Sequence, residues 1–194
     1  MIQQYNLHNL IEKVGRNEIE RFISTFECNL DREIEHFLLE KAIIYEQHNI
    51  SRTFLVVNDN HEHVYLLAYY TIVMKEFKLE EKLSRSKKKK YLGTTFEINQ
   101  PFPAILIGRI GKNTSVLKQL QISGENLMLR ILETVNRICD YAGGRLLYVE
   151  AKDNKYLHTF YTASSFSLYH DESNQPIVNK QGLFTYLLPC SKCF

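Results

Sequence analysis

Long apolar runs and a secretory signal are both missing from this sequence of 194 residues. No apolar run approaches the roughly 20 residues that a membrane-spanning helix needs. Residues 1–16 (MIQQYNLHNLIEKVGR) lack the basic stretch followed by an apolar stretch that marks a signal peptide. We therefore expect a cytoplasmic protein without a membrane partner.

Cysteine is scarce, and neither sign of charge dominates. The four cysteines are scattered at positions 28, 139, 190 and 193, which argues against a disulfide framework in a cytosolic chain of this size. The formal net charge of +2 is too small to indicate nucleic-acid binding by itself. The length and the 44% hydrophobic content suit one domain with a sizeable core, or one core with an insertion.

Metal-binding patterns are incomplete. His61, Glu62 and His63 form a short cluster in a predicted hairpin turn, without a third partner. Cys190 and Cys193 have CxxC spacing, but there is no second pair, and they lie at a terminus. We therefore predict no metal site.

The first half of the chain predicts a short strand, helices and a hairpin. Residues 17–20 (NEIE) have the form of a capping box at the start of a helical stripe. A second amphipathic helix is predicted over 31–47. Residues 53–57 and 64–74 are rich in β-branched and aromatic residues and flank a polar turn, so they predict an antiparallel hairpin.

The second half predicts a βαβ crossover. Strands at 104–110 and 145–151 are separated by a helix at 124–141, so the two strands should be parallel. A short helix at 155–163 and two strand-like runs follow. The summed order predicts an α+β (mixed α/β) fold, with a central mixed twisted sheet flanked by helices in a single domain over residues 1–194.

Residues 76–100 interrupt this pattern. Glutamate and lysine alternate there and are followed by the basic run RSKKKK at 85–90. We interpret the segment as a helix and an exposed loop inserted between core strands. A solvated, mobile segment is the usual outcome of such a run, and a contact to a polyanion is the alternative.

The stretch PAILIGRIGKNTSVLKQLQISGENL at 103–127 predicts a buried strand, a polar loop and the start of a helix. Unpaired N–H groups at a helix N-terminus, together with the helix dipole, favour an anion there. The Walker lysine pattern and a full GxGxxG are both missing, so this stretch alone is weak support for phosphate binding.

Several motifs, in the expected order, resemble the GNAT superfamily of N-acetyltransferases, which use acetyl-CoA. The family's pyrophosphate loop reads Gln/Arg-x-x-Gly-x-Gly/Ala, and residues 121–126 read QISGEN, with Asn126 in place of the small last residue. ILIGRI at 105–110 is similar to the family's fourth strand, whose amides pair with the pantetheine arm. The segment from Asn154 to Tyr161 is similar to the helix on the cofactor side.

The resemblance implies a role for each motif. The loop amides would hold the pyrophosphate, and the strand amides would orient the thioester and stabilise the oxyanion. Tyr161 falls where many members have a general acid for the departing sulfur, although a packed aromatic ring is the alternative. Asn154 could contact the cofactor or simply cap its helix. The implied cofactor-binding residues are Ile107, Gly108, Arg109, Ile110, Gln121, Ile122, Ser123, Gly124, Glu125, Asn126, Asn154 and Phe160.

A narrower resemblance covers nearly the whole chain. FECNLD at 26–31, SRTF at 51–54 and PAILIGR at 103–109 are similar to the toxin-type GNAT enzymes. Those enzymes acetylate the amino group of aminoacyl-tRNA and are paired with a DNA-binding antitoxin. The resemblance therefore implies acetyl-CoA as cosubstrate and an amine acceptor such as aminoacyl-tRNA. An antitoxin protein and a second copy of the chain, forming a homodimer, are the further partners to consider.

No general base stands out. Glu150 ends a predicted strand and could orient a water, but a solvated surface carboxylate is the competing interpretation. The predicted function is that of an acetyl-CoA-dependent N-acetyltransferase. The alternative is a catalytically impaired GNAT-fold binding module that acts in protein or nucleic-acid recognition. Asn126 favours this alternative, as do Ser164 and Ser165, which stand where the Gly-Phe usual after the tyrosine helix is missing.

Overall fold

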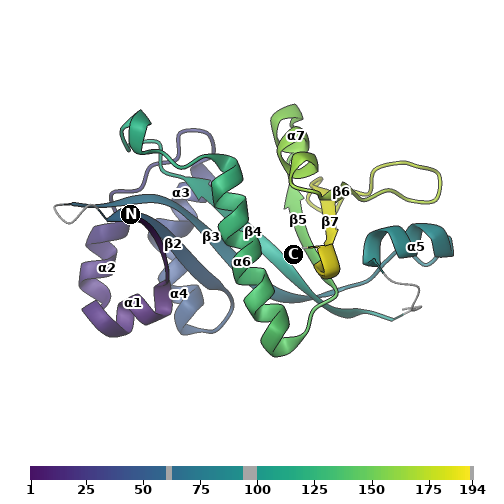
Figure 1. Ribbon diagram of the computed structural model, residues 1–194, viewed down its shortest axis with the longest axis horizontal. Helices are drawn as coiled ribbons and strands as arrows, with labels where there is room; N and C mark the ends of the chain where they lie inside the picture. Colours follow the sequence, from purple (N-terminus) through teal and green to yellow (C-terminus); the bar gives the residue numbers. More distant parts are fainter. Residues whose placement is uncertain (60–62, 94–99, 193–194) are drawn as a thin grey trace. The chain divides into compact units, whose positions relative to one another are not determined.

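The computed structural model describes residues 1–59, 63–93 and 100–192. Within these ranges the strands form a seven-stranded mixed sheet in the order β1-β2-β3-β4-β5-β7-β6 (Figure 1). The predicted α+β class, a mixed sheet with helices, is therefore confirmed.

The chain divides into two compact units. Unit 1 comprises Met1–Val73 and Gly108–Leu127, and unit 2 comprises Met74–Ile107 and Met128–Phe194. Each unit is described by itself below. The single domain over residues 1–194 stays a prediction.

Three strands of unit 1 are antiparallel. β1 (Ile2–Asn6) pairs with β2 (Arg52–Asp59), and β2 pairs with β3 (Val64–Phe77), with a bulge between Val56 and Val57. The predicted hairpin is confirmed, and β3 runs three residues beyond the predicted end at 74.

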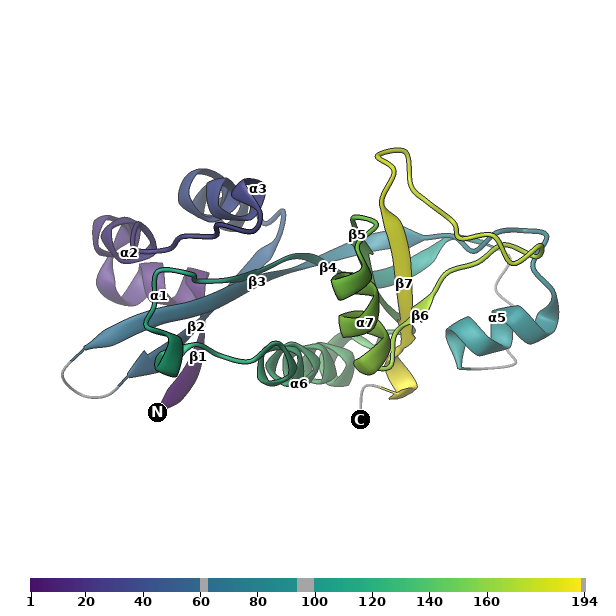
Figure 2. The ribbon, with the colours of Figure 1, turned by 90° about the horizontal axis from the view of Figure 1, so that it is seen from above.

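Unit 1 contains a series of short helices after β1. Helices α1, α2 and α3 lie on the same face of β2 and β3 (Figure 2). α2 begins at Arg16. Its N-cap residue is Gly15, which has a φ of 88°. The predicted capping box at 17–20 is therefore wrong, because Asn17 already lies inside the helix. These helices are α1 (Leu7–Val14), α2 (Arg16–Ile23), α3 (Arg32–His36) and α4 (Ala42–Gln47).

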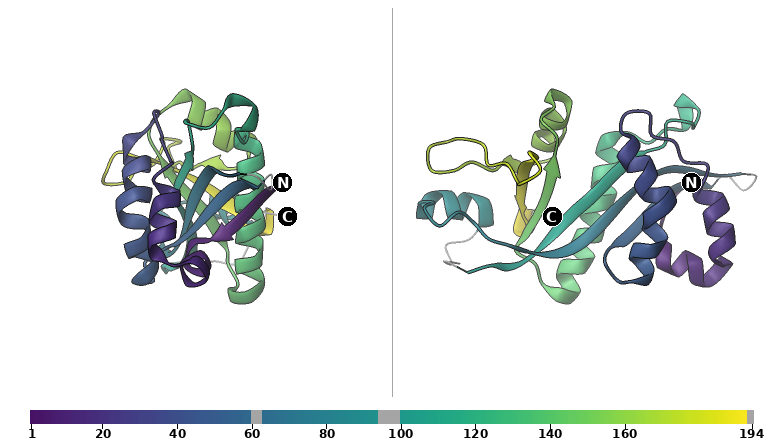
Figure 3. Two further views of the ribbon diagram at one scale, coloured as in Figure 1. Left: turned by 90° about the vertical axis from the view of Figure 1, so that its left-hand side faces the viewer. Right: turned by 180° about the vertical axis from the view of Figure 1, so that it is seen from behind.

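The predicted helix over 31–47 is confirmed as a continuous run of α3, a π-helical turn η1 (Phe37–Lys41) and α4. This run is seen from behind in the right-hand view of Figure 3. Asp31 caps it, since its side chain accepts a hydrogen bond from the Glu33 N–H at 3.0 Å. The Ala42 N–H donates to the Phe37 carbonyl, five residues back, which makes the π turn.

The core of unit 1 forms where these helices meet the hairpin. Phe26 packs edge-on against Tyr69, with ring centroids 5.2 Å apart. Gly111 of β4 lies against the same rings, because a Cβ there would come within 2.9 Å of Tyr69 and 2.4 Å of Ile34. The buried apolar residues of this core are Leu7, Ile19, Ile23, Phe26, Cys28, Phe37, Leu38, Ala42, Ile43, Leu55, Val57, Leu66 and Tyr69.

Unit 2 contains the crossover. β4 (Phe102–Lys112) and β5 (Leu146–Ala151) are connected through α6 (Gly124–Ala142) and are parallel, as predicted, with Ile105 opposite Leu147 and Ile107 opposite Val149. β7 (Phe184–Pro189) is antiparallel to β5 and to the short β6 (Ser167–Leu168). A 3-10 turn, η3 (Cys190–Lys192), follows β7. α7 (Lys155–Ala163) has the bounds predicted for the tyrosine-bearing helix.

The basic run of the expected insertion is helical. α5 (Arg85–Leu92) contains it and lies beside the polar loop that follows β6 (Figure 1). Residues 94–99 of the expected insertion lie outside the described residues.

Aromatic rings make up much of the core of unit 2. Phe77 contacts Phe102, Tyr148 and Tyr169, with ring centroids 4.9–6.1 Å apart. Tyr91 of α5 packs edge-on against Tyr169 at 5.1 Å, which ties α5 to this core.

Candidate functional site

The loop before α6 lies in unit 1 and is held by contacts within itself. It contains a 3-10 turn, η2 (Lys118–Leu120). Gln121 donates its side-chain Nε2 to the carbonyl of Val116 at 3.1 Å. Ile122 is buried. Gln121, the first residue of the implied pyrophosphate motif, therefore stabilises the loop. Ile122, the apolar residue after it, anchors the loop to the core.

Ser123 caps α6. Its Oγ accepts a hydrogen bond from the Asn126 N–H at 3.1 Å, and its carbonyl accepts one from the Leu127 N–H at 3.1 Å. The N–H groups of Gly124 and Glu125 donate to no residue in the part of the chain that the structure describes. Two backbone donors thus remain at the positive end of the helix dipole, where an anion is stabilised.

The strand residues implied as thioester contacts divide between the units. Ile107 is buried in unit 2 and pairs with Val149, the last parallel pair between β4 and β5 in the described register. Gly108 belongs to unit 1, where a Cβ would lie 2.8 Å from the Thr71 Oγ1. Its lack of a side chain is therefore required by packing.

Arg109 and Ile110 also lie in unit 1. Arg109 is exposed, and its guanidinium lies 5.3 Å from the centroid of the Phe37 ring, a cation–π arrangement. Its Nη1 donates to the carbonyl of Gly108 at 2.8 Å. Ile110 is half-buried.

Tyr161 lies in unit 2 inside an aromatic cluster. Its ring is 5% exposed, and the ring centroids of Phe160 and Tyr186 lie 5.1 Å away. Burial, and then the neighbouring Tyr186, raise the pKa of the Tyr161 hydroxyl, so this group stays protonated. Among the described residues the hydroxyl has no hydrogen-bond partner.

A Schellman motif ends α7 and fixes the tyrosine ring. The Phe166 N–H donates to the Tyr161 carbonyl at 3.0 Å, and the Ser165 N–H donates to the Thr162 carbonyl at 3.0 Å. The Phe166 ring then packs edge-on against Tyr161 at 5.8 Å, the apolar contact that accompanies this motif. Ser165 has a φ of 68°. The turn is therefore kept, with a serine in the left-handed conformation that favours glycine.

Asn154 caps α7. Its side-chain oxygen accepts hydrogen bonds from the Tyr156 and Leu157 N–H groups at 2.8 and 3.3 Å. Capping is thus one role of this residue, and a cofactor contact stays a prediction. Phe160 stacks on Tyr156, with ring centroids 6.5 Å apart and planes 2° from parallel.

Glu150 is half-buried on β5 and opposite Thr185 of β7. Burial, and then the Glu150 carboxylate, raise the pKa of Tyr148 to about 12. The structure therefore gives Glu150 a neighbouring tyrosine rather than a fully solvated position.

The implied site residues are distributed over both units, each with its local geometry. Unit 1 holds Gly108, Arg109, Ile110, Gln121, Ile122, Ser123, Gly124, Glu125 and Asn126, and unit 2 holds Ile107, Asn154, Phe160 and Tyr161.

Sequence reasoning missed Asn113, which organises the segment at 25–31 of unit 1. Its side-chain oxygen accepts hydrogen bonds from the Glu27 N–H at 3.1 Å and from Ser115. Its side-chain nitrogen donates to the carbonyls of Thr25 and Leu66 at 3.1 and 2.8 Å. The signal was three turn-forming residues, Asn-Thr-Ser, directly after a buried strand.

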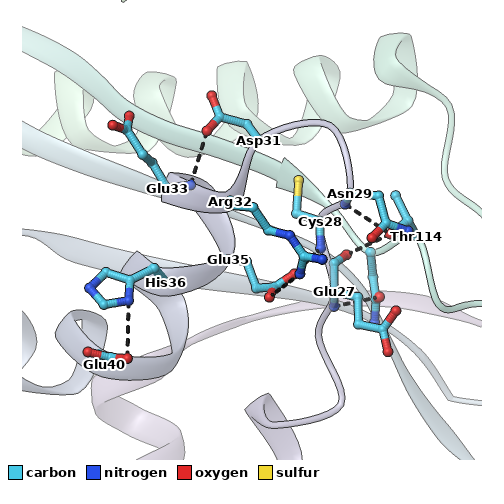
Figure 4. A network of polar contacts seen from close by, with 11 residues as sticks. Glu27, Cys28, Asn29, Asp31, Arg32, Glu33, Glu35, His36, Glu40 and Thr114 are labelled. Atoms are coloured by element: carbon cyan, nitrogen blue, oxygen red, sulfur yellow. Dashed lines mark hydrogen bonds and ion pairs between the residues drawn. The ribbon is translucent and has the colours of Figure 1, made fainter.

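The neighbouring network continues from Cys28 (Figure 4). The Cys28 N–H donates to Glu35 at 2.7 Å, and Arg32 pairs with the other oxygen of Glu35 at 2.8 Å. The hydrogen bond from Cys28 lowers the pKa of Glu35; burial opposes it and Arg32 adds to it. Thr114 accepts from the Asn29 N–H at 3.3 Å (Figure 4). Residues 26–31 are therefore held in place through polar contacts to 113–115.

The described residues contain no group of three or more histidine, cysteine or acidic side chains that could hold a metal ion. His61, Glu62 and Cys193 lie outside the described part of the chain. No described helix has the length and apolarity needed to cross a membrane.

Neither a protein-family model nor a curated protein matches the sequence. Solved structures do match over nearly the full length. A tyrosine-to-phenylalanine mutant of KacT is similar with a TM-score of 0.69 and 20% identity, covering 99% of this chain and 96% of KacT. AtaT complexed with acetyl-methionyl-tRNAfMet is similar with a TM-score of 0.68 and 21% identity, covering 98% of this chain and 96% of AtaT.

The chain has a GNAT-like fold. A tyrosine-to-phenylalanine mutant of the AtaT toxin, bound to acetyl-CoA and to the C-terminus of the antitoxin AtaR, is also similar. Its TM-score is 0.62 at 18% identity, and the match covers 99% of this chain and 95% of that one. The structural similarity to toxins of this type, expected from the sequence motifs, is thus confirmed at the level of the fold.

Proposed function

We propose that this chain is an acetyl-CoA-dependent N-acetyltransferase that acetylates the amino group of an aminoacyl-tRNA. The observation that carries the proposal is the nearly full-length likeness to AtaT, a toxin solved both with acetyl-methionyl-tRNAfMet and with acetyl-CoA. An antitoxin partner, as AtaR is for AtaT, belongs to the same proposal.

The residues at the start of α6 fit the pyrophosphate of acetyl-CoA. The backbone donors of Gly124 and Glu125 have no partner among the described residues, and they stand at the positive end of a 19-residue helix. Ser123 satisfies the third donor and so fixes the geometry of the first turn. In this proposal Gln121 shapes the loop rather than contacting the phosphates.

Tyr161 is the proposed general acid. The neutral amine attacks the thioester carbonyl, the C–N bond forms and the C–S bond breaks, and the Tyr161 O–H gives its proton to the leaving sulfur. The proton lost by the amine passes to water, which can also return a proton to the tyrosinate. Burial raises the pKa of Tyr161, so its hydroxyl is protonated at neutral pH and has a proton to give, and the packed ring fixes the position of that hydroxyl.

The alternative function is a binding module without catalysis, and one observation favours it. Asn126 stands where the resemblance calls for a small residue, close to where the phosphates would approach. The second argument for this alternative is weaker than the sequence indicated, because Ser165 adopts the left-handed turn usually made by glycine. Calorimetric titration with acetyl-CoA is the first test, since a protein that lacks affinity for acetyl-CoA is not this enzyme.

The acceptor is tested by incubating the protein with acetyl-labelled acetyl-CoA and charged tRNA. We expect label in the RNA fraction and its loss with the Tyr161→Phe variant. Label on a polyamine or a peptide instead would overturn the tRNA acceptor and leave the acetyltransferase standing. A protein that binds acetyl-CoA but transfers label to none of these acceptors would support the binding module.

A further inference from the structure

Helix α5 of unit 2 has an unfavourable charge distribution. Its eight residues, RSKKKKYL, include no acidic side chain, and its first turn contains Arg85 and Lys87. Cations near a helix N-terminus oppose the helix dipole, and like charges four apart, as at Arg85 and Lys89, repel each other. A helix this short is marginal in water even when its charges are favourable. Contacts with the rest of unit 2 must therefore hold it.

Those contacts are made by one face of the helix. Lys87 points inward, and its Nζ donates to the carbonyls of Asp171 and Glu172 at 2.6 and 3.1 Å and to the Asn174 side chain at 3.1 Å. All three donor positions of this ammonium group thus have acceptors in one loop. Lys87 is an internal anchor although it belongs to an uninterrupted run of four lysines.

The two ends of α5 are fixed as well. Ser84 caps the first turn through its Oγ, and its N–H donates to the Glu172 carboxylate at 2.9 Å. At the other end Tyr91 is buried, and its hydroxyl accepts from the His170 N–H at 3.0 Å. The helix is therefore attached along its length and presents a fixed outer face.

Lys89 and Lys90 lie on that outer face. Both are exposed, and Lys90 extends over the Tyr91 ring, 5.6 Å from its centroid. Holding these cations close together on a pre-ordered helix costs stability in the free protein, and proteins break local rules of this kind mainly where function requires it. Phosphate groups placed against the helix would remove the repulsion.

We propose that the outer face of α5 docks the phosphate backbone of RNA through Lys89 and Lys90, and that Lys87 only positions the helix. The choice of RNA rests on the proposed function, in which the acceptor amine is attached to a tRNA. The division of labour within the lysine run follows from the contacts of the helix alone.

The test measures binding of an uncharged, fluorescently labelled tRNA acceptor-stem hairpin to the full chain over a range of salt concentrations. Neither acetyl-CoA nor an amino acid is needed, so a failure of acetyl transfer does not affect the result. The Lys89→Ala/Lys90→Ala variant is compared with Lys13→Ala/Lys41→Ala, which removes two exposed lysines from unit 1 and leaves the same net charge.

Each phosphate-contacting lysine contributes about one unit to the slope of log affinity against log salt. We therefore expect the Lys89→Ala/Lys90→Ala variant to lose about two units of slope, and the unit 1 variant to keep the parent slope. Equal slopes in the two variants would overturn the docking face. Binding of polyglutamate in competition with the hairpin, with the same dependence on Lys89 and Lys90, would overturn RNA in favour of an acidic protein.

The anchor is tested with Lys87→Met, which keeps the aliphatic stem. We expect faster hydrogen exchange of the α5 amides in this variant without RNA, and parent-like exchange in Lys89→Ala/Lys90→Ala. Unchanged exchange in Lys87→Met would contradict the anchor. Circular dichroism checks that both variants fold.

Discussion

Asn113 of unit 1 and Tyr161 of unit 2 are both buried polar side chains, 3% and 5% exposed, yet their polar atoms have opposite surroundings. The Asn113 amide accepts from two segments and donates to two carbonyls, and every polar group it faces is paired. The Tyr161 hydroxyl has no hydrogen-bond partner among the described residues, and it is the tyrosine ring that packs against three other aromatic rings.

The difference separates a group that stabilises the fold from a group held ready for a ligand. The Tyr161 oxygen is not among the fully buried polar atoms that lack a partner in the described part of the chain, so its unpaired state does not carry a full desolvation cost. The burial of Asn113 is offset by its hydrogen bonds to residues 86 to 88 positions away in the sequence. The Tyr161 oxygen makes no hydrogen bond among the described residues, so Tyr161 contributes to stability through the packing of its ring.

The largest expected effect is on turnover in Tyr161→Phe. The phenyl ring keeps the contacts with Phe160, Phe166 and Tyr186, so unfolding by urea should be nearly unchanged. Loss of a general acid should lower kcat by a factor of about 100 to 10,000. Steady-state kinetics with charged tRNA, alongside calorimetry with acetyl-CoA, check both halves of the expectation. Near-normal turnover would remove Tyr161 from the mechanism.

Asn113→Ala should have the opposite effect, because it should lower the stability of the protein. It removes the hydrogen bonds of the Asn113 side chain with the carbonyls of Thr25 and Leu66 and with the Glu27 N–H, while Ser115 Oγ still donates to the Thr25 carbonyl. We expect the free energy of unfolding to fall by about 2–3 kcal/mol, because a buried polar group that loses its partner, here the Leu66 carbonyl, costs about 1–3 kcal/mol and the other lost hydrogen bonds about 0.5–1.5 kcal/mol each. The exposed Asn17→Ala is the control and should shift stability by less than about 0.5 kcal/mol. A loss as small as that of the control would show that Asn113 is not the centre of its network.

Tyr186→Phe is an intermediate case within unit 2. Tyr186 is buried like Tyr161, but its hydroxyl lies 3.4 Å from Nδ1 of His158. Removing this one hydrogen bond should cost about 0.5–1.5 kcal/mol in urea unfolding. The double variant Tyr186→Phe/His158→Ala tests the pairing, because it should cost little more than the first change alone. Strictly additive losses would argue against the contact.

Ser165→Gly should stabilise the protein by about 0.5–1 kcal/mol, because glycine adopts positive φ without the steric cost that serine carries. Ser164→Gly is a matched control one residue earlier. Ser164 has a φ of −87° and donates its hydroxyl to the Phe160 carbonyl, so the same change there should destabilise. Equal effects at the two positions would contradict the described turn.

The smallest expected effect is an absence of alkaline inactivation. Burial raises the pKa of Tyr161, so the protonated form persists and general-acid activity is lost only above the ordinary range for tyrosine. We expect the rate to rise with pH as the acceptor amine loses its proton and then to stay level to about pH 10. A fall in rate below that pH, with circular dichroism unchanged, would mean that a group of lower pKa is the acid.

Several elements could be predicted from the sequence because their signals are local. The helix at 155–163 has its cap at Asn154 and ends before two small polar residues, and α7 has those bounds. The β-branched and aromatic residues at 53–57 and 64–74, on either side of a polar turn, predicted the hairpin, and the order strand, helix, strand predicted the parallel pair of β4 and β5. The prediction at 17–20 failed because Gly15, with its positive φ, starts the helix two residues earlier than the capping-box pattern.

What the tertiary structure decided depends on residues far apart in the chain. From the sequence alone, Lys87 is one of four equivalent lysines. Only its hydrogen bonds to the loop at 171–174 distinguish it as an anchor. From the sequence alone, Asn113 is part of a polar turn. Only its hydrogen bonds to the carbonyls of Thr25 and Leu66 show that it connects separate segments. Residue type and spacing determine which helices and strands can form, since these depend on neighbours along the chain. The partner of a buried polar group is set by the folded arrangement, because it comes from a segment that local sequence does not specify.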